Sequence, residues 1–485
     1  MKPFDLAEGA RLAMLEHGFA PDMPEAARKE GDALEPARLV APGLRDLRAL
    51  VWSSIDNDES RDLDQIEVAE ALPKGLIRVR VGVADVAALV TKGSPLDQHA
   101  LQNTCTVYTG PRIFPMLPES LSTDHSSLNE AADRLAIVIE MDVDESGMVV
   151  HSDVYSAAVK NHAKLAYDGV GAWLEGRGPA PAKVAASRVL QEQLHLQDKA
   201  AEALKKLRYE RGALDLETIE ARAVVKDNAV LGIEVTQKNR ARSLIEDFMI
   251  AANGAIARFL DASGVASVRR VVKAPERWLK IVAVAKGLGD DLPDEPSSRA
   301  LSAFLDRRKV ASPDTFGDLS LTIVKLMGPG EYALERPGMP HDGHFGLAVT
   351  DYTHSTAPNR RFADLVTQRL VKAVLAKAPC PYTDDELAAV AARCTQKEND
   401  ARKVERTTRK QAAALYLASH IGQEYDAIVT GAADKGTFAR LLDPPAEGRI
   451  VEGQHGLDVG DHVRVRLVAT EPRKGFIDFA RAEKQ

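Results

Sequence analysis

Apolar and polar positions follow two different periods along this chain. Between residues 77 and 84 apolar and polar side chains alternate, as they do in a half-buried strand. Residues 135–141 form a nearly continuous apolar run, which predicts a strand buried on both faces. Helical spacing predicts long helices at about 188–209, 242–262, 362–377 and 384–420. Because strands and helices do not alternate regularly, we expect a multidomain α+β protein with a mixed α/β central part.

The first 48 residues predict a small helical module. Apolar residues from Phe4 to Leu15 follow helical spacing, and Pro21 and Asp22 end the pattern. A second short helix is predicted from Pro24 to Lys29. Two alternatives stay open for residues 1–48: a helix-turn-helix-like module, or a helical cap packed on the rest of the chain, which we favour.

From about residue 423 the pattern becomes entirely β. Alternation predicts strands at 425–431, 436–441, 459–468 and 474–479. Short strands at this density suit a five-stranded OB-fold barrel over residues 423–485. Phe438 is the candidate for a stacking surface there, because aromatic faces hold nucleic-acid bases at roughly 1–3 kcal/mol each. A place in the barrel core is the alternative for Phe438.

Length, charge and cysteine content limit the possible functions. A chain of 485 residues holds about two to four domains. A net charge of −8 lacks the basic footprint of a nucleic-acid-binding protein, unless Lys and Arg line an internal channel. The cysteines Cys105, Cys380 and Cys394 form no Cys-x-x-Cys pair, so we expect neither zinc nor disulfides. Without a signal-peptide core or a long apolar run, we expect a cytoplasmic protein that does not enter a membrane.

The candidate chemistry begins in an acidic stretch, with five acidic residues in the nine positions from Asp56 to Asp64. Asp62 and Asp64 are two positions apart, so they point to the same face of an extended segment. Asp56 lies across a polar loop that can fold back. Convergent carboxylates at a strand mouth suit Mg²⁺, which prefers a few carboxylates plus substrate phosphate oxygens. A solvated acidic loop is the alternative.

A second segment, residues 352–365, runs into a helical pattern. We expect Ser355 or Thr356 to cap this helix, with Pro358 in its first turn. Arg360 and Arg361 would then lie near a helix start, where the helix dipole disfavours a cation. This placement indicates an anionic partner, either a phosphate or acidic surface residues.

Both segments resemble the motifs of the ribonuclease II family catalytic domain, the RNB domain. The acidic stretch is similar to the family's first motif, and Tyr352 to Leu365 is similar to its second. Further blocks also resemble the family, in family order between about residues 50 and 420, namely 107–108, 114–122, 127–129, 162–168 and 244–253. We therefore expect an RNB domain over residues 49–420. Residues 423–485 resemble the RNA-binding OB fold named after ribosomal protein S-one.

The resemblance implies a processive hydrolase that degrades single-stranded RNA from its 3′ end and releases nucleoside 5′-monophosphates. It implies two Mg²⁺ ions, for which Mn²⁺ can substitute, held by Asp56, Asp62 and Asp64. Asp64 would lie closest to the attacking water. Arg360 would offer its planar fork to the scissile phosphate. Asp364, one helical turn later, would orient Arg360 or serve a structural purpose.

The resemblance also implies residues that bind RNA or support the site. Tyr108 and Tyr167 stand where the family stacks aromatic residues on bases, which selects unpaired strands. Arg361 is expected to contact RNA. Glu246 and Asn253 are seven residues apart on one predicted helix, hence on one face, and would support the site. The expected assembly is a monomer with single-stranded RNA as its partner.

Departures from the family pattern keep alternatives open. Many relatives have a further Asp where this chain has Gln65, which can bind a metal-bound water but supplies no charge. One alternative is therefore an RNA-binding regulator that is catalytically weak or inactive. Another is a hydrolase of single-stranded DNA. Degradation of duplex RNA also stays open, because 48 residues cannot hold the two cold-shock domains that relatives carry before the catalytic domain.

Overall fold

The largest part of the molecule is built on a curled β-sheet. The computed structural model describes residues 4–39, 43–217, 220–226, 229–236, 238–433 and 436–482. The main sheet has six strands in the order β1-β8-β2-β3-β4-β7. These strands are β1 (Arg45–Asp46), β2 (Trp52–Asp56), β3 (Gln65–Ala71), β4 (Ile77–Ala84), β7 (Asp133–Val143) and β8 (Val149–Ala166).

The sheet curls because the long strand β8 pairs both with β2 and with β7, the strand at the other end of the order. Its first part runs antiparallel to β7, and its last six residues run parallel to β2. The predicted strands at 77–84 and 135–141 are confirmed as β4 and β7. The parallel pairing sets Asp56 beside Ala166. The acidic loop that follows β2 therefore lies next to the residues that follow β8.

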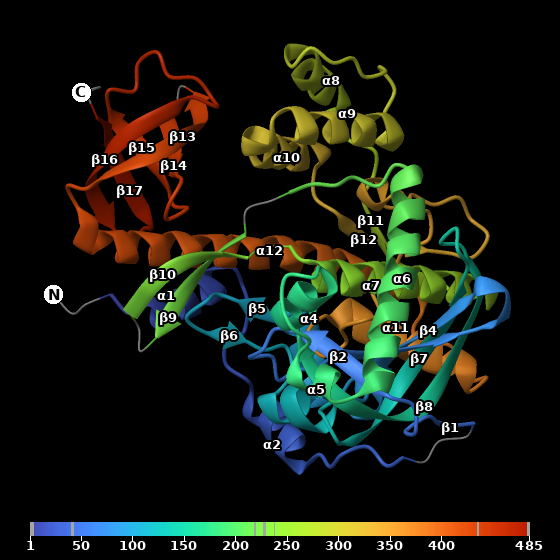
Figure 1. Cartoon of the computed structure of the whole chain (residues 1–485). Coiled ribbons are helices and arrows are strands. Elements are labelled where there is room, and N and C mark those ends of the chain that lie inside the picture. Colours follow the sequence, from blue (N-terminus) through green and yellow to red (C-terminus); the bar gives the residue numbers. More distant parts are fainter. Residues whose placement is uncertain are drawn as a thin grey trace.

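Long helices cover this sheet, and all four that the sequence predicted are present (Figure 1). Helix α6 packs against β3, β4 and β7, while α7 packs against α6, β7 and β8. The helices around the sheet are α3 (Pro95–Asn103), α4 (Tyr167–Leu174), α5 (Ala182–Ala185), α6 (Arg188–Glu210), α7 (Arg240–Ala262), α11 (Phe362–Leu375) and α12 (Asp384–Leu417).

Three further helices form a small group with a hydrophobic core of its own, around Trp278, Phe304 and Phe316. They are α8 (Trp278–Gly287), α9 (Ser298–Ala311) and α10 (Pro313–Met327). Figure 1 shows this group above the sheet and beside the C-terminal barrel.

Three strand pairs of the described residues lie outside the main sheet and the barrel. They are β5 (Val107–Tyr108) with β6 (Ile113–Phe114), β9 (Glu220–Lys226) with β10 (Ala229–Thr236), and β11 (Ser267–Val271) with β12 (Glu331–Glu335).

The N-terminal helices pack onto α12 and α3. Helix α1 (Leu6–Glu16) is capped by Asp5, whose side chain accepts from two amides of the first turn. Its apolar face, with Ala10 and Met14, shares a core with Val404 of α12. Helix α2 (Glu25–Ala33) packs against α3. The described residues thus have the arrangement of the helical cap, the alternative that we favoured.

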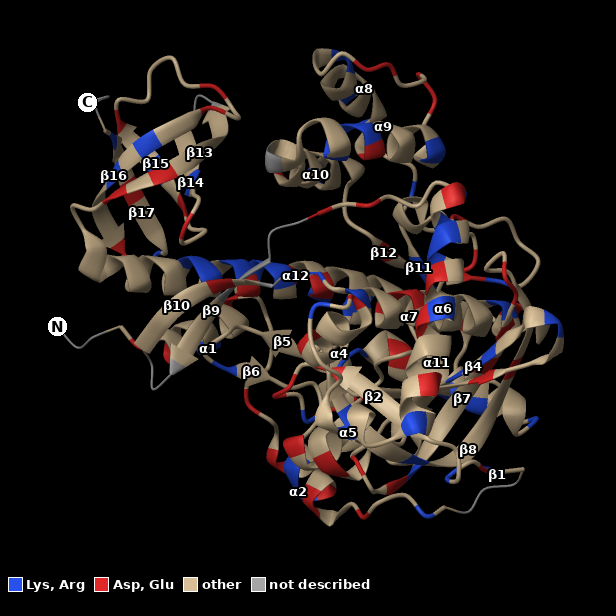
Figure 2. Cartoon of the chain, viewed as in Figure 1, with Lys and Arg blue, Asp and Glu red and all other residues tan. Residues whose placement is uncertain are grey.

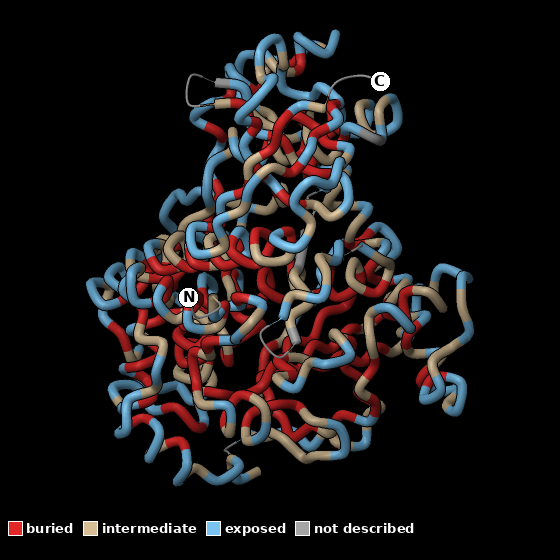
Figure 3. Tube along the Cα trace, turned by 90° about the vertical axis from the view of Figure 1, so that its left-hand side faces the viewer, coloured by how far each residue is buried: buried red, intermediate tan, exposed pale blue. Residues whose placement is uncertain are grey.

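The C-terminal residues form a closed five-stranded barrel in the order β13-β14-β15-β17-β16. Its strands are β13 (Glu424–Ala433), β14 (Gly436–Leu441), β15 (Glu447–Glu452), β16 (His462–Glu471) and β17 (Phe476–Arg481). Four match the predicted strands, and β15 supplies the fifth. Ala413, Ala414 and Leu417 at the end of α12 belong to the barrel core. Figure 3 shows buried residues inside both the barrel and the part built on the main sheet.

Two findings complete the fold. The predicted start of the helix after residue 352 is wrong, because α11 begins at Phe362 with Arg361 as its N-cap. Ser355 and Thr356 do not cap the helix: the Ser355 hydroxyl donates to the side chain of Asn253, and the Thr356 hydroxyl accepts from Nη2 of Arg361 at 3.5 Å. Within the described ranges, no helix combines the length and the apolar character that crossing a membrane requires.

Candidate active site

The acidic stretch and the arginine motif meet in space. Asp56 ends β2, and Asp62 and Asp64 lie in the loop that leads into β3, which Gln65 opens. The loop before α11 crosses this point. Nε of Arg360 donates to Oδ2 of Asp64 at 3.1 Å, and the backbone amide of Asn359 lies 3.4 Å from Oδ1 of Asp64. Two motifs separated by almost 300 residues therefore share one site.

The three aspartates lie close enough to influence one another's protonation. Asp64 is buried, and burial raises its pKa to about 7, with a further rise from Asp62 and an opposing effect of Arg360. Burial also raises the pKa of Asp62, and Asp56 adds to that rise. Ser53 pairs with Glu67 across β2 and β3, and extending this register sets Asp56 opposite Asp64. The carboxylates thus converge at the mouth of two strands.

This donor set fits a hard divalent cation. Mutual repulsion and burial disfavour the charged carboxylates, and a bound cation would remove both penalties. Among the residues that the structure describes, no group of three or more His, Cys, Asp or Glu side chains is already arranged around one ion position. Since Mg²⁺ keeps several waters and uses substrate phosphate oxygens, it does not need a complete cage of protein ligands.

A fourth carboxylate lies behind this cluster. Glu67, on β3, is fully buried, and neither of its carboxylate oxygens has a hydrogen-bond partner. The hydroxyl of Ser53, its partner across the strands, also lacks one. Burial raises the pKa of Glu67 well above its ordinary value, and Asp56 adds to the rise. Burial therefore favours the neutral form of Glu67 over the charged form, unlike in an ordinary surface glutamate.

Tyr108 flanks the acidic cluster on one side. Residues 104–106 pair with 360–362 like two short strands, because the Thr106 amide donates to the Arg360 carbonyl and the Phe362 amide to the Thr104 carbonyl. This pairing brings Tyr108, on β5, next to Arg360. Burial raises the pKa of the Tyr108 hydroxyl, and the charges of Arg360 and Asp62 also act on it.

A cavity of about 250 Å³ opens between Tyr108, Arg360 and α12. Its lining includes residues that the sequence analysis did not select. Oε1 of Glu405, on α12, accepts from the Tyr108 amide at 3.3 Å. The Tyr332 hydroxyl lies 2.8 Å from Nδ1 of His354, on the far wall. His354 belongs to the second motif, so its position in that motif was a signal that could have found it.

Tyr167 flanks the cluster on the other side, at the first position of α4. The guanidinium of Arg242 lies 4.4 Å from the centre of its ring and also donates to the side chain of Asn57. These residues line a second cavity, of about 800 Å³, together with the basic side chains of Lys238 and Arg177. The two predicted tyrosines therefore stand on either side of the aspartates.

The two arginines of the second motif have different partners. Nη2 of Arg361 donates to Oδ1 of Asp364 at 2.7 Å, and the same oxygen accepts from the Ala357 amide. Asp364 therefore orients Arg361 and its loop, which is the structural one of the two roles left open for it. The physical reason is the extended backbone of Arg361, which turns neighbouring side chains to opposite sides. A contact of Arg361 with RNA stays a prediction.

The remaining candidates lie at different distances from the cluster. Asn253, on α7, accepts from both the amide and the hydroxyl of Ser355 and so supports the second motif. Glu246, seven residues earlier, instead lies 3.9 Å from Lys238. Phe438 lies on β14 of the barrel with 37% of its surface exposed. Figure 2 shows Lys and Arg gathered along the half of α12 next to the barrel.

Comparisons with known proteins cover both parts of the chain. Residues 44–377 match the model of the RNB domain, and residues 423–482 match that of the RNase II-type exonuclease C-terminal S1 domain. Ribonuclease R of Thermotoga maritima is 29% identical over 96% of this chain and 68% of its own length. Ribonuclease R 1 of Lactococcus lactis is 29% identical over 90% and 56%, and ribonuclease R of Escherichia coli is 30% identical over 97% and 61%. The chain thus spans between about half and two thirds of these relatives.

Solved structures show the same fold at lower identity. RNase R of Mycoplasma genitalium in complex with ribose-methylated single-stranded RNA superposes with a TM-score of 0.89 at 22% identity, covering 99% of this chain and 78% of the other. Yeast Ssd1, described as a pseudonuclease, superposes with a TM-score of 0.71 at 15% identity, covering 92% and 55%.

Proposed function

The chain belongs to the RNB-domain family, and from this premise we propose that it is a processive 3′-to-5′ exoribonuclease. It hydrolyses single-stranded RNA to nucleoside 5′-monophosphates. The observation that carries the proposal is the contact of Arg360 with Asp64 inside a group of three aspartates flanked by Tyr108 and Tyr167. This arrangement joins metal-binding carboxylates, a phosphate-binding fork and two base-stacking rings. We further propose that the protein acts as a cytoplasmic monomer.

The chemistry follows from the charges of these residues. Asp56, Asp62 and Asp64 would hold two Mg²⁺ ions, or Mn²⁺ in their place, which supply a nucleophilic water and relieve charge on the leaving 3′ oxygen. Asp64 would lie closest to the attacking water and accept its proton as a general base. Gln65 accepts or donates a hydrogen bond at the edge of this group without adding charge.

Arg360 stabilises the developing charge on the scissile phosphate. Only its Nε is engaged by Asp64, so its two terminal nitrogens are available for phosphate oxygens. The contact with Asp64 also fixes the fork before substrate arrives, which lowers the cost of ordering it. Arg361, held by Asp364, fixes the backbone from which Arg360 projects.

Selection of single strands follows from the aromatic residues. Tyr108 and Tyr167 can stack only on bases that are not paired. The barrel, with Phe438 on its surface, and the basic half of α12 extend the same binding path. Contacts along such a path keep the shortened strand bound after each cleavage, as processive degradation requires.

The experiment that tests the proposal is degradation of a labelled oligoadenylate with and without Mg²⁺, with analysis of the products. The proposal expects Mg²⁺-dependent shortening from the 3′ end and nucleoside 5′-monophosphate as the main product. A matched deoxyoligonucleotide tests the hydrolase of single-stranded DNA, and a duplex with a 3′ overhang shows whether paired RNA is degraded. Shortening of the DNA at the same rate as the RNA would contradict the proposed substrate.

A second candidate is an RNA-binding regulator with a weak or inactive site. Gln65 is the observation that favours it, because a neutral amide stands where many relatives have an aspartate. The fold is shared with a protein described as a pseudonuclease, so the fold alone does not guarantee activity. RNA binding without Mg²⁺-dependent shortening would select this candidate.

A further inference from the structure

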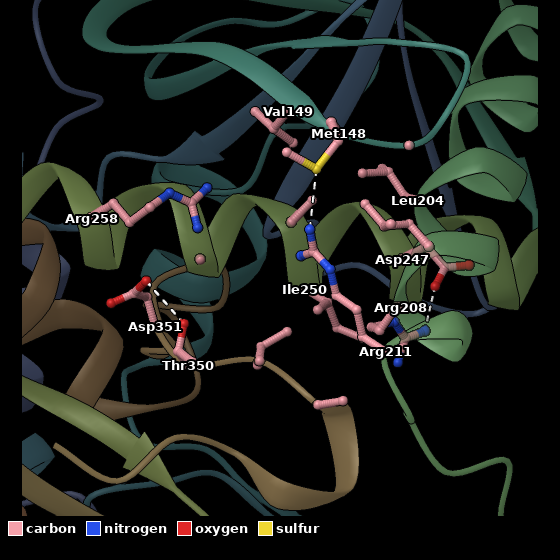
Figure 4. A pocket seen from close by; sticks show the side chains of 16 residues that line it. Met148, Val149, Leu204, Arg208, Arg211, Asp247, Ile250, Arg258, Thr350 and Asp351 are labelled. Carbon is pink, nitrogen blue, oxygen red and sulfur yellow. Dashed lines mark hydrogen bonds and ion pairs between the residues drawn. The ribbon is translucent and has the colours of Figure 1, made fainter. Parts of the chain in front are cut away.

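A cavity on the far side of α7 carries features that the proposed reaction does not use. Its volume is about 490 Å³, within the roughly 300–1,000 Å³ of small-molecule sites. Its walls come from α6, α7, the turn between β7 and β8, and the segment before the second motif. Figure 4 shows Arg208, Arg211 and Arg258 directed into this space.

The three arginines differ in their partners. Arg208 is paired with Asp247. Arg211 donates to the sulfur of Met148 at 3.1 Å, its one hydrogen bond among the residues that the structure describes, and a thioether is a weak acceptor. Within the described residues, no hydrogen bond or ion pair engages Arg258. Two guanidinium groups therefore face the cavity without a strong acceptor.

The side chains that line this cavity carry a net positive charge, although the net charge of the whole chain is negative. The only other charged side chains in the lining are Asp247 and Asp351, and each already has a partner. Asp247 is paired with Arg208, and Asp351 lies 3.4 Å from Nε2 of His341 and also accepts from Thr350. Three arginines against two aspartates leave one positive charge. Desolvation also lowers the pKa of Arg258, a cost that a bound anion would offset.

Most of the remaining lining is apolar. Met148, Val149, Leu204 and Ile250 lie around the arginines (Figure 4), and Val349 also lines the cavity. A polarisable thioether and flat aliphatic surfaces suit a ring system such as a nucleobase. The cavity thus combines a place for a small dianion with a place for an uncharged ring.

Helix α7 connects this cavity to the candidate active site. Arg242, at its start, contacts Tyr167, and Asn253 holds Ser355 of the second motif. Asp247, Ile250, Gly254 and Arg258, on other faces of the same helix, line the cavity. The cavity is therefore separate from the aspartate cluster, with one helix between them.

We propose that this cavity is a binding site for a nucleoside 5′-monophosphate, with Arg211 and Arg258 on the phosphate and the apolar walls on the base. The choice of this ligand rests on the proposed function, because the reaction would release such nucleotides close by. Guanidinium groups bind phosphate oxygens through paired hydrogen bonds, which a thioether cannot match.

The test is equilibrium binding of AMP to the full chain without RNA and with EDTA present. Adenosine and inorganic phosphate serve as the two partial ligands. AMP is expected to bind at least tenfold more tightly than either one. The variant carrying both Arg211→Gln and Arg258→Gln should lose at least tenfold in AMP affinity while its RNA degradation stays within twofold of the unmodified protein. Arg188→Gln, an exposed position on the same helix α6, is the matched control and should change nothing.

A second variant, Met148→Glu, tests the proposal independently in case the double arginine variant does not fold. Met148 is 42% exposed, so Met148→Glu is expected to fold, and its new carboxylate would occupy Arg211 and repel a phosphate. Equal affinity for phosphate and AMP would overturn the assignment of a nucleotide. Loss of AMP binding in Tyr108→Ala, with binding kept in both cavity variants, would place AMP in the catalytic cavity and overturn the new site. Because these measurements need no catalysis, an inactive protein that binds AMP here would contradict only the proposed function.

Discussion

Nε of Arg360 and Oδ2 of Asp64 lie 3.1 Å apart, although 296 positions separate the two residues in the chain. The contact joins the residue expected nearest the attacking water to the residue expected on the phosphate. It offsets part of the burial cost of Asp64, whose pKa is nevertheless raised to about 7. The separate roles of the two side chains can be tested by changing each one alone.

Replacement of Asp64 by Asn should abolish hydrolysis and preserve RNA binding. The amide keeps the shape of the side chain and removes the charge that holds metal and takes up a proton, at a cost of several kcal/mol in the transition state. Single-turnover cleavage and a binding titration measure the two properties. Asp58→Asn, at an exposed position of the same acidic stretch, is the control. A rate above about a tenth of the unmodified enzyme in Asp64→Asn would rule out its assigned role.

Replacement of Arg360 by Lys should lower kcat strongly and leave RNA affinity nearly unchanged. Lys keeps the positive charge but has no planar fork, so it loses contacts made mainly in the transition state. Steady-state kinetics on a short oligoribonucleotide separate kcat from KM, and Arg307→Lys, at an exposed position of α9, serves as a comparison. An increase in KM alone would mean that Arg360 binds substrate and does not act in catalysis.

Replacement of Glu67 by Gln should stabilise the protein increasingly as pH rises. The ordinary pKa of glutamate is 4.5, and burial raises that of Glu67 well above it, so above pH 4.5 the unfolded chain loses a proton that the folded chain keeps. The free energy of unfolding therefore falls with rising pH in the unmodified protein, and Gln removes this loss.

Denaturant unfolding at pH 5 and pH 8, with EDTA, measures the effect. The advantage of Glu67→Gln should be larger at pH 8 by at least about 1 kcal/mol, since one unit of pKa shift corresponds to about 1.4 kcal/mol. Glu452→Gln, on the exposed side of β15, is the control. An advantage that shrinks between pH 5 and pH 8 would show that Glu67 is charged in the folded protein.

Replacement of Phe438 by Ala should weaken RNA binding without slowing cleavage. Loss of one stacked base costs roughly 1–3 kcal/mol, or about fivefold to 150-fold in affinity. Single-turnover cleavage of a saturating short RNA should stay within threefold, because the barrel supplies no residue of the aspartate cluster. Val459→Ala, at another exposed apolar position between barrel strands, is the control. Unchanged affinity in Phe438→Ala would exclude this residue from the binding path.

Local patterns were sufficient for most elements of the fold. The prediction of a helix at 384–420 nearly coincides with α12, because Thr383 and Glu386 form a capping box at its start. The alternation in β16 likewise marks inner and outer faces correctly. The pairing of β8 with both β7 and β2 has no such local signal, since register depends on strands far away in sequence.

The sequence predicted the site residues that belong to a family motif. It did not predict contacts that form only through the tertiary fold. Asp64 and Arg360 follow from their motifs. For Asp364, a role in orienting Arg360 and a structural role both stayed open, because helical spacing alone does not show that the backbone of Arg361 is extended. Glu405 meets Tyr108 only because α12 crosses behind β5. The arginines of the 490 Å³ cavity come from α6, the residue after its end, and α7, so nothing in the sequence sets them side by side.

Helix α12 carries both Glu405, at the catalytic cavity, and Leu417, in the barrel core. Twelve residues of unbroken helix between them span about 18 Å at a rise of 1.5 Å per residue. The length of the helix therefore sets the distance between the cavity and the barrel, and its rotation per residue sets the orientation of the barrel. One residue inserted into α12 would rotate the barrel by about 100° about the helix axis. Seven inserted residues would return the barrel to within about 20° of its present orientation and move it about 10 Å along the axis. The length of this one helix therefore sets the shortest RNA that can contact both the cavity and the barrel.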